Sequence, residues 1–355
     1  MDFSVLNSSF QRERLIEDWN SLVWTERHSV NGDFELQSHN ISEVLSLLPL
    51  GDWDAPPTVV AINDSDVPMV VENHKIEKPK NGPPQIVTTG RSFETVLDRR
   101  VTIRAVTSGV TRLEWRIAAD TAAIAAYEVA KSIVVDGDAT ALDIMDEITL
   151  LNSVTDIGDE QEFPVEPKEL YAWMIETLAL GKYGLKSKMP TSTTEIAIII
   201  YEGTDRSESV VFDVALDQFE EASYLLSKLG YKNVMITATA NGMEFSHMGT
   251  DPSGLVRRVG FQDLASEITV PAGVPLTDLT INKGKVSLAS LVPTALFSGG
   301  IAESVGQGYN STYFLGDIVR LQGEYGLSQD ARVAEFVRTQ DTTGTKAYPT
   351  FEAIA

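Results

Sequence analysis

The stretch that most constrains the fold is YFLGDIVRLQGEYGLSQDARVAEFV, which runs from Tyr313 to Val337. Branched apolar residues gather on both sides of the polar segment GEYGLSQD, whose two glycines and polar side chains favour a turn. The pattern predicts two β-strands joined as a hairpin. Other apolar runs, such as the one between Glu195 and Tyr201, are also strand-sized, and none reaches the ~18–20 residues of a membrane span.

Strand patterns dominate residues 1–117. In LVWTERHSVNGDFELQ, Asn31-Gly32 is the predicted centre of a two-residue turn, because both residues accept a positive φ. Phe34 and Leu36 then fall on one face of the second strand. Asn241-Gly242 predicts another hairpin of this kind, and further strands are predicted at 195–203, 208–214 and 254–263.

The middle of the chain changes to helical spacing. The Ala-rich segment 119–134 predicts a helix that Asp120 or Thr121 could cap. The segment 138–154 has Leu142, Met145, Ile148 and Leu151 at steps of three and predicts an amphipathic helix. A third helix is predicted in 167–185, with a buried stripe formed by Leu170, Trp173, Met174, Thr177 and Leu178. Strands at both ends and helices between them indicate the α+β class.

The composition is strongly acidic. The chain has 28 Lys and Arg against 51 Asp and Glu, which gives a net charge of −23 over 355 residues. This charge opposes direct binding to nucleic acid and docking on anionic lipid. It fits either a soluble surface whose copies repel each other or a wall along which nucleic acid passes without sticking. Cysteine is absent, so disulfides and thiolate chemistry are excluded.

Motifs of catalysis and cofactor binding are missing. There is no G-x-S-x-G elbow, phosphate-binding loop or dinucleotide fingerprint. His28 and His39 could face each other on a hairpin, but no third metal ligand is indicated. An acidic turn that caps the next helix explains Asp136, Asp138 and Asp143 better than a calcium loop does. A pair of catalytic carboxylates is defined by a separation in space, so the sequence cannot reveal one. We expect no catalytic residue, no cofactor and no metal.

Arginines gather in GRSFETVLDRRVTIR, from Gly90 to Arg104. The cluster is either a solvated basic face or an interface that meets the acidic surface of a neighbouring copy, since Arg binds carboxylates well. The candidate interface residues are Arg91, Arg99 and Arg100.

Several motifs occur in an order that resembles a known family. They are SLVWTERHSVNGDFEL, GRSFETVLDRRV, YEGTDRSESVVFD, GLVRRVGFQD, YFLGDIVRL and ARVAEFV. In this order they resemble minor tail proteins of long, non-contractile-tailed bacteriophages (siphophages), especially those of actinobacteria. Members look like tail-tip hub proteins, similar in fold to the baseplate hub of contractile tails and to the N-terminal region of tail-associated lysins.

The resemblance implies a multidomain tail-hub fold with two β-barrel domains and intervening α/β domains. The expected units are a first β-barrel-like domain, a mainly helical α/β domain, a second β-barrel-like domain, an irregular or helical insertion, and a C-terminal hairpin that completes the second barrel. Their expected limits are 1–117, 118–195, 196–262, 263–308 and 309–355.

The resemblance also implies a function and a set of partners. The chain would form a homotrimer at the virion's tail tip, assembled in the host cytoplasm. It would adapt a hexameric ring of the distal tail protein to a trimeric tip, close the tail tube and open for DNA passage. Other expected partners are the C-terminal end of the tape-measure protein and central fibre or receptor-binding proteins. Neither sequence-specific nucleic-acid binding nor stable membrane insertion is expected.

Two other functions remain open at this point. The chain could be a tail-associated cell-wall hydrolase, although it ends at Ala355, just after the last predicted hairpin, where relatives carry an extra hydrolase domain. It could also be a receptor- or carbohydrate-binding tail protein that uses a surface aromatic such as Trp53.

Overall fold

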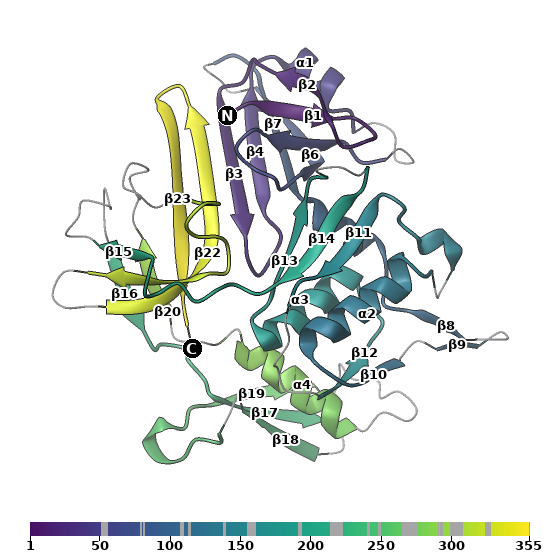
Figure 1. Ribbon diagram of the computed structural model, residues 1–355, viewed down its shortest axis with the longest axis vertical. Helices are drawn as coiled ribbons and strands as arrows, with labels where there is room; N and C mark the ends of the chain where they lie inside the picture. Colours follow the sequence, from purple (N-terminus) through teal and green to yellow (C-terminus); the bar gives the residue numbers. More distant parts are fainter. Residues whose placement is uncertain are drawn as a thin grey trace.

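A computed structural model shows the arrangement of the chain (Figure 1). The structure describes residues 1–50, 56–78, 80, 82–106, 110–112, 115–137, 140–154, 161–190, 194–213, 223–239, 242–247, 250–264, 276–289, 291, 294–298, 308–323 and 328–354. Trp53 and Asp138 lie outside the described residues.

One large sheet joins the two ends of the chain. Its eleven strands follow the order β15, β21, β22, β3, β4, β7, β6, β5, β1 and β2, and β23 pairs with the other edge of β22. Their bounds are β1 Phe3–Leu6, β2 Arg12–Ile16, β3 Ser21–Arg27, β4 Asp33–Ser38, β5 Val59–Ile62, β6 Met69–Glu77, β7 Gln85–Ser92, β15 Val211–Asp213, β21 Ile318–Gln322, β22 Ser328–Asp341 and β23 Gly344–Ala353.

Smaller sheets and the helices complete the described structure. The three-stranded sheets have the orders β11-β14-β13 and β18-β17-β19, and three further pairs are β10-β12, β16-β20 and β8-β9. The strand bounds are β8 Arg104–Val106, β9 Val110–Arg112, β10 Trp115–Asp120, β11 Ile148–Asn152, β12 Gln161–Val165, β13 Gly184–Lys188, β14 Ile196–Tyr201, β16 Ser223–Ser227, β17 Val234–Thr239, β18 Gly242–His247, β19 Val259–Asp263 and β20 Thr294–Ser298. The helices are α1 Ile41–Leu47, η1 Phe93–Arg99, α2 Ala122–Val134, η2 Ala141–Asp143, α3 Leu170–Gly181, η4 Gly254–Val256 and α4 Leu276–Ala289.

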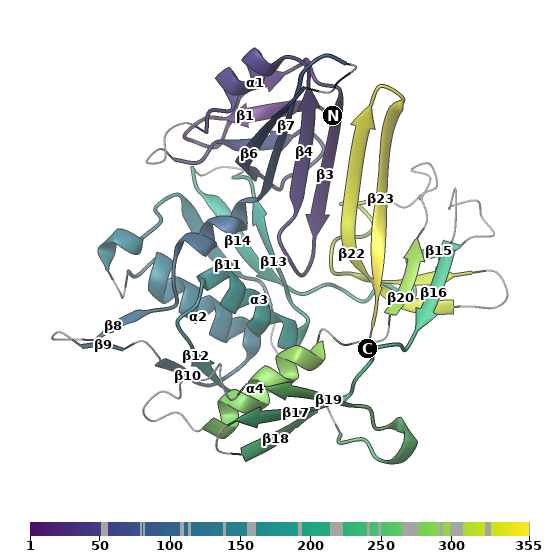
Figure 2. The same ribbon diagram turned by 180° about the vertical axis from the view of Figure 1, so that it is seen from behind.

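The class is α+β, as predicted, but the expected closed barrels are not found among the described strands. The large sheet is open, because its path ends at β15 and β2 and these strands do not pair with each other. The cause lies in β22, which is 14 residues long. One edge of β22 pairs first with β21 and then, beyond an irregularity at residues 333–335, with β3. The N-terminal strands therefore extend the C-terminal hairpin instead of closing on themselves (Figures 1 and 2).

The predicted C-terminal hairpin is confirmed, since β21 and β22 pair antiparallel with Ile318 opposite Arg332. The same hairpin pairs with β3 at the other end of the chain. The five domain limits expected from the resemblance stay a prediction. Strand pairing does run between these units, because segments 1–117, 196–262 and 309–355 all contribute strands to one sheet.

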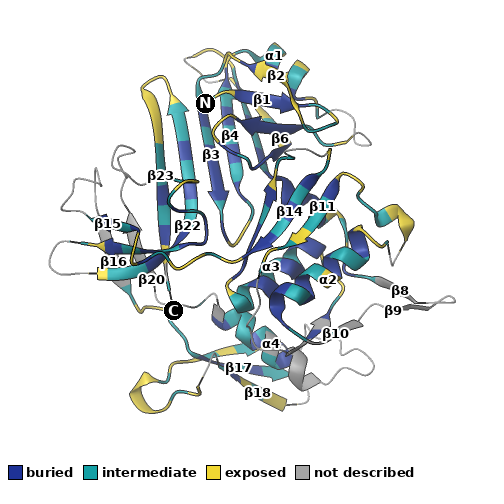
Figure 3. Ribbon diagram, viewed as in Figure 1, coloured by how far each residue is buried: buried dark blue, intermediate teal, exposed yellow. Residues whose placement is uncertain are grey.

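Three groups of buried side chains form the core (Figure 3). The largest includes α2 and α3, which pack against each other, and the sheet β11-β14-β13. A second, with Phe3, Trp24 and Phe34 in mutual ring contact, lies within the N-terminal strands. The third lies inside the C-terminal hairpin, around Phe212 and Phe351.

Two predicted helices are confirmed. In α2, the alanine side chains are buried, and Thr121 is at the N-cap position, although its hydroxyl makes no capping hydrogen bond. In α3, all five residues of the predicted stripe are buried. The helix ends at Lys182, whose φ of 59° places it in the left-handed region. This ending turns the chain directly into β13.

The predicted helix at 138–154 is wrong. Only η2 is helical there, and residues 148–152 form β11, which pairs in parallel with β14. Ile148, Leu150 and Leu151 suit a strand beside the branched residues of β14, because branched side chains fit a pleated surface. Leu142 lies outside the core, with 87% of its surface exposed. The apolar spacing of three in this segment therefore does not reflect a helix, because it spans η2 and β11.

The Asn31-Gly32 turn is also not the predicted two-residue turn. The pairing of β3 with β4 ends at Thr25 opposite Asp33, so residues 26–32 form a longer connection. β3 continues along β22 instead, with Arg27 opposite Glu335. Phe34 and Leu36 are both buried on one face, as predicted. The second hairpin forms between β17 and β18, although residues 240 and 241 of its turn lie outside the described part.

Glu26 lies at the centre of a buried contact that we call the hairpin junction, formed by Glu26, Ser65, Tyr309 and Arg338. Arg338 donates to Glu26 Oε1, and the two side chains are 7% and 2% exposed. Ser65 Oγ donates to Oε1 at 2.7 Å, and Tyr309 OH donates to Oε2 at 2.7 Å. The Tyr309 ring stacks on Phe336, 3.9 Å between centroids. The junction therefore joins β3 to the C-terminal hairpin, and the positive charge of Arg338 neutralises the buried carboxylate of Glu26.

His28, next along the chain from β3, holds three segments together. Its backbone N–H donates to Ala334 O at 2.9 Å. Nε2 lies 3.2 Å from Lys182 O, which can only accept, so Nε2 carries the proton. Nδ1 then accepts from Tyr201 OH at 3.0 Å. Burial, with a smaller contribution from the Arg332 charge, lowers the pKa of His28 to about 4.

A second buried glutamate has a different set of partners. Glu94, on η1, is 2% exposed and accepts from Ser187 N at 3.1 Å, from Ser187 Oγ at 2.7 Å and from Ser92 Oγ. We call Ser92, Glu94 and Ser187 the Glu94 junction, which joins the N-terminal sheet to β13. No Lys or Arg of the described chain pairs with Glu94. Burial raises the pKa of its carboxyl, and the hydrogen bonds from Ser187 and Ser92 only partly oppose this effect.

Candidate interface groove

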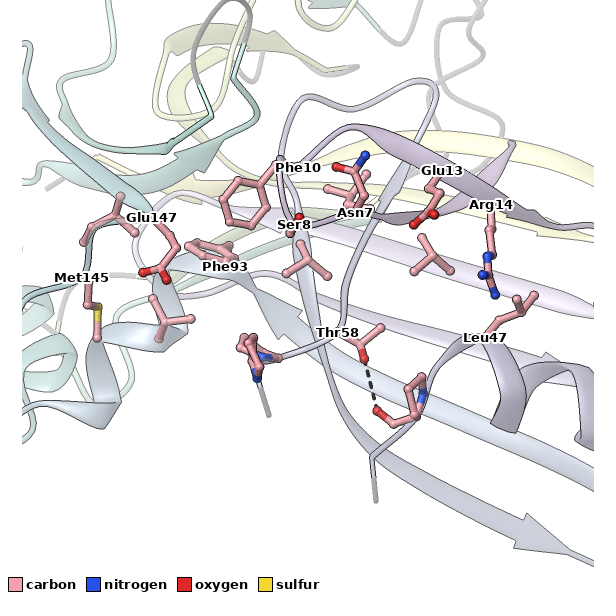
Figure 4. Close-up of a pocket in the computed structure, with 18 of the residues that line it drawn as sticks. Asn7, Ser8, Phe10, Glu13, Arg14, Leu47, Thr58, Phe93, Met145 and Glu147 are labelled. Atoms are coloured by element: carbon pink, nitrogen blue, oxygen red, sulfur yellow. Dashed lines mark hydrogen bonds between the residues drawn. The ribbon is translucent and has the colours of Figure 1, made fainter. Parts of the chain in front are cut away.

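A groove opens between the N-terminal strands and the helical part of the molecule (Figure 4). Its volume is about 720 Å³. Six segments line it, namely β1, the connection from β1 to β2 with the start of β2, the end of α1, the residues around the start of β5, η1 with Arg100, and residues 145–148. Elements far apart in the sequence therefore meet there.

The middle of the groove is apolar. The rings of Phe10 and Phe93 meet edge to face, 5.7 Å between centroids. Val96, Met145 and Leu47 continue the apolar lining. Such a surface fits an apolar group of another protein better than a polar small molecule.

Phe10 is held in an unfavourable backbone conformation. Its φ is 55°, which non-glycine residues seldom adopt. Asn7 stabilises the turn, because its Oδ1 accepts from Ser9 N at 2.9 Å and from Gln11 N at 3.0 Å, while Asn7 O accepts from Phe10 N. Strain of this kind concentrates at functional sites. Here it directs the Phe10 ring toward Phe93.

Charged side chains occupy the two ends of the groove. Glu13 and Arg14 lie at the end near α1, and Glu147 lies beyond Phe93 at the other end (Figure 4). Arg99 also lines the groove, is exposed, and has no carboxylate partner among the described residues. Charges of both signs therefore flank the apolar middle of the groove.

The structure separates the three arginines named as interface candidates. Arg99 and Arg100 line the groove, whereas Arg91 is not among the lining residues. Arg100 Nε donates to Asp143 O at 2.9 Å and lies 3.4 Å from Asp143 Oδ1. Arg91 is already engaged, with two bonds to Glu72 at 2.7 and 2.8 Å and one to Asp98 at 3.2 Å. The interface role of all three stays a prediction.

The two histidines considered as a metal pair are in different surroundings. His28 is buried between Tyr201 and Lys182, and His39 is exposed beside Pro84 O. The described residues hold no group of three or more His, Asp or Glu side chains placed to bind a metal ion. No described helix combines the length and apolar character that crossing a membrane requires.

Sequence reasoning singled out Arg99 and Arg100, which line the groove, because arginines cluster in an acidic chain. It missed Phe10, Asn7 and both buried junctions. No sequence pattern around Phe10 predicts its place in the groove, because the direction of its ring depends on its backbone conformation. The partners of Glu26 lie up to 312 positions away.

A family model confirms the resemblance. The model described as "Siphovirus ReqiPepy6 Gp37-like protein" matches residues 2–351, which is nearly the whole chain. No curated protein sequence shows a significant match.

Solved structures of phage tail proteins have a similar fold along their whole length. The 43 kDa tail protein of prophage MuSo2 from Shewanella oneidensis is 14% identical with a TM-score of 0.58, and the match covers 99% of this chain and 96% of that one. A tail protein from Neisseria meningitidis MC58 is 11% identical with a TM-score of 0.60, over 99% and 96% of the two chains. Prophage tail protein gp18 from Listeria monocytogenes EGD-e is 11% identical with a TM-score of 0.54, over 99% and 94%.

At these identities the structural likeness establishes a common fold, and the family model establishes membership. The chain belongs to the Siphovirus ReqiPepy6 Gp37-like protein family and folds like phage tail proteins.

Proposed function

We propose that this chain is a structural protein of the virion, the homotrimeric hub at the tip of a siphophage tail. The observation that carries the proposal is the extent of the match: family and tail-protein fold both run through nearly the entire chain. The role is non-enzymatic. The buried carboxylates of Glu26, Glu94 and Asp317 are all engaged in hydrogen bonds that join segments of the fold.

In this role the chain adapts a hexameric ring of the distal tail protein to a trimeric tip. It contacts the C-terminal end of the tape-measure protein on the inside and central fibre or receptor-binding proteins below. The tip closes the tail tube and opens for DNA ejection. The net charge of −23 supports passage of DNA without binding, because acidic side chains repel phosphates.

The groove is the surface that we assign to a protein neighbour in the tip. Its apolar middle and the unpaired Arg99 suit a partner that presents apolar and acidic side chains. Arg99→Glu is expected to weaken self-association at moderate salt. Lys80→Glu is the comparison variant, since Lys80 is exposed and lies outside the groove. If Arg99→Glu assembles as well as the wild type does, the assignment of Arg99 to the interface is wrong.

Gold labelling of intact particles with an antibody against this chain tests the proposed role. Label confined to the tail tip, where the tube meets the fibre, is the expected result. Label along the tube or on the head, or particles without label, would contradict the hub role and reopen the hydrolase and receptor-binding alternatives. Zymography on host cell wall and glycan binding by the purified chain would then separate those two.

A further inference from the structure

Three fully or largely exposed apolar side chains lie together with positive charges. Leu255 and Val256, on η4, are 103% and 67% exposed, and Leu229 is 91% exposed. Lys228 and Arg258 lie beside them, and neither has a carboxylate partner among the described residues. We call these five residues the basic turn. A cluster of exposed apolar side chains of this kind marks an interaction site more often than an isolated one does.

Hydrogen bonds fix the basic turn in place. Asn233 Nδ2 donates to Val256 O at 2.8 Å, and Asn233 Oδ1 accepts from Arg258 N at 2.7 Å. Arg258 Nη1 donates to Lys228 O at 2.9 Å. The two segments are therefore held against each other, so docking costs little ordering entropy.

A second exposed turn has the opposite charge. Leu142, on η2, is 87% exposed, and Val135, at the end of α2, is 42% exposed. Asp146 and Glu147 are exposed nearby, and no cation of the described chain pairs with either. We call Val135, Leu142, Asp146 and Glu147 the acidic turn. It borders the groove, because Glu147 lines the groove as well.

The two turns lie on opposite sides of the molecule. In Figure 1, η2 follows α2 at the right edge and η4 lies at the lower left, and Figure 2 shows the same separation from behind. Both are among the exposed segments of Figure 3. The turns of one copy therefore cannot meet each other, whereas those of two successive copies can.

We propose that the basic turn of one copy binds the acidic turn of the next, in a head-to-tail contact. Opposite charges guide two strongly acidic chains together at the surface where repulsion is lowest, and the exposed leucines and valines are then buried. A head-to-tail contact closes a ring when its rotation divides a full turn evenly, as the proposed trimer requires. The proposal rests on the proposed function, because it names the surfaces that would join copies in the tip.

An anionic lipid surface is the other occupant that a basic, apolar turn could accept. A second copy is favoured because this chain itself presents the complementary acidic, apolar surface. Lipid binding is therefore treated as an outcome of the test.

The absence of cysteine makes disulfide crosslinking a sharp test, since Leu142→Cys and Val256→Cys each introduce the only thiol in the chain. The two variants are produced separately and together in virus-producing cells. Cells and purified particles are then oxidised and examined on non-reducing gels. A linked pair of chains is expected only when both variants are present. The double variant is expected to give linked species larger than a pair.

Two controls accompany the crosslinking. Val30→Cys is an exposed position outside both turns and is expected to give no linkage with Val256→Cys. Arg258→Glu is expected to lower the yield of linked chains about twofold to fivefold, and adding Asp146→Arg to restore it. Higher salt should lower the yield in the same direction.

Three results would overturn the contact. One is equal linkage from either single variant alone, which indicates a symmetric contact. Another is no linkage in cells or particles that contain both variants. A third is co-sedimentation of the wild-type chain with phosphatidylserine vesicles that Leu255→Ser abolishes. The gold label reports separately on the hub role. Linked chains with label away from the tail tip would support the contact and reject the hub role. Label at the tip without linked chains would support the hub role and reject the contact.

Discussion

The hairpin junction and the Glu94 junction both bury a glutamate that is 2% exposed, yet they hold its charge in different ways. Glu26 is neutralised by Arg338 and also accepts from two hydroxyl groups. Glu94 has hydroxyl and backbone donors but no cation. A buried pair is lost as a unit when one member is removed, whereas an unpaired buried carboxylate is itself a source of instability. The same substitution should therefore have opposite effects at the two sites.

Glu26→Gln should have the largest effect. It leaves Arg338 buried and charged without a partner, which should lower the free energy of unfolding by about 3–5 kcal/mol. Urea unfolding of the purified chain measures the loss. The double variant Glu26→Gln with Arg338→Met is the control, because it removes both charges and should recover much of the loss. A loss no greater than that of Glu94→Gln would end the distinction between the junctions.

Acid should next weaken the buried contacts of His28 with Tyr201 and Lys182. Its pKa is lowered from 6.5 to about 4, so the native state excludes a proton that the unfolded chain binds. Stability present above pH 6.5 should fall by on the order of 3 kcal/mol as the pH drops to 4. His28→Gln keeps a donor and an acceptor but cannot titrate. Unfolding measured at a series of pH values should show a smaller acid loss in this variant, and parallel curves would contradict the assignment.

Tyr309→Phe removes one bond to Glu26 while the ring still stacks on Phe336. Because the acceptor is charged, the loss should be about 1.5–3 kcal/mol, below that of Glu26→Gln. Thermal unfolding of wild type, Tyr309→Phe and Ser65→Ala compares the two hydroxyl donors directly. A neutral Tyr309→Phe would show that Arg338 alone satisfies the carboxylate.

Glu94→Gln should have the smallest effect, a gain in the free energy of unfolding whose size depends on pH. The native pKa of Glu94 lies above its ordinary value of 4.5, so the folded state binds a proton at a higher pH than the unfolded chain does. Wild-type stability from this group therefore rises as the pH falls through the raised pKa and is fully present below 4.5. The glutamine resembles the protonated acid at all pH values. Its advantage over wild type should be greatest at neutral pH and shrink toward pH 4.5, as paired urea titrations would show.

Local patterns predicted the elements whose determinants are local. A run of alanines indicates α2, and a stripe of five buried residues indicates α3. The segment containing Leu142 and Leu151 was assigned wrongly, because only the neighbouring strand β14 makes residues 148–152 a strand. Tertiary pairing there overrides a spacing that also fits a helix.

The open sheet and the two junctions could not be predicted from the sequence, because they too depend on contacts between distant segments. The pairing of β22 with β3 joins Asp341 to Ser21, and no pattern near either residue encodes that partner. Two residues of the arginine cluster, Arg99 and Arg100, line the groove, but no sequence pattern predicted the groove itself. Its apolar middle depends on Phe10 and Phe93, which meet from separate segments. A cluster of charged residues can be recognised within a short stretch of sequence. A groove cannot, because its lining comes from segments far apart in the chain.

The pairing of β3 with β22 also sets an order of events during protein synthesis. β3 leaves the ribosome early, but its partner is made more than 300 residues later. At ~5–20 residues per second, this edge stays unpaired for roughly 15–60 s. During this time the unpaired N–H and C=O groups of β3 are exposed and can pair with strands of other chains. The edge stays open to such pairing until the C-terminal hairpin is made.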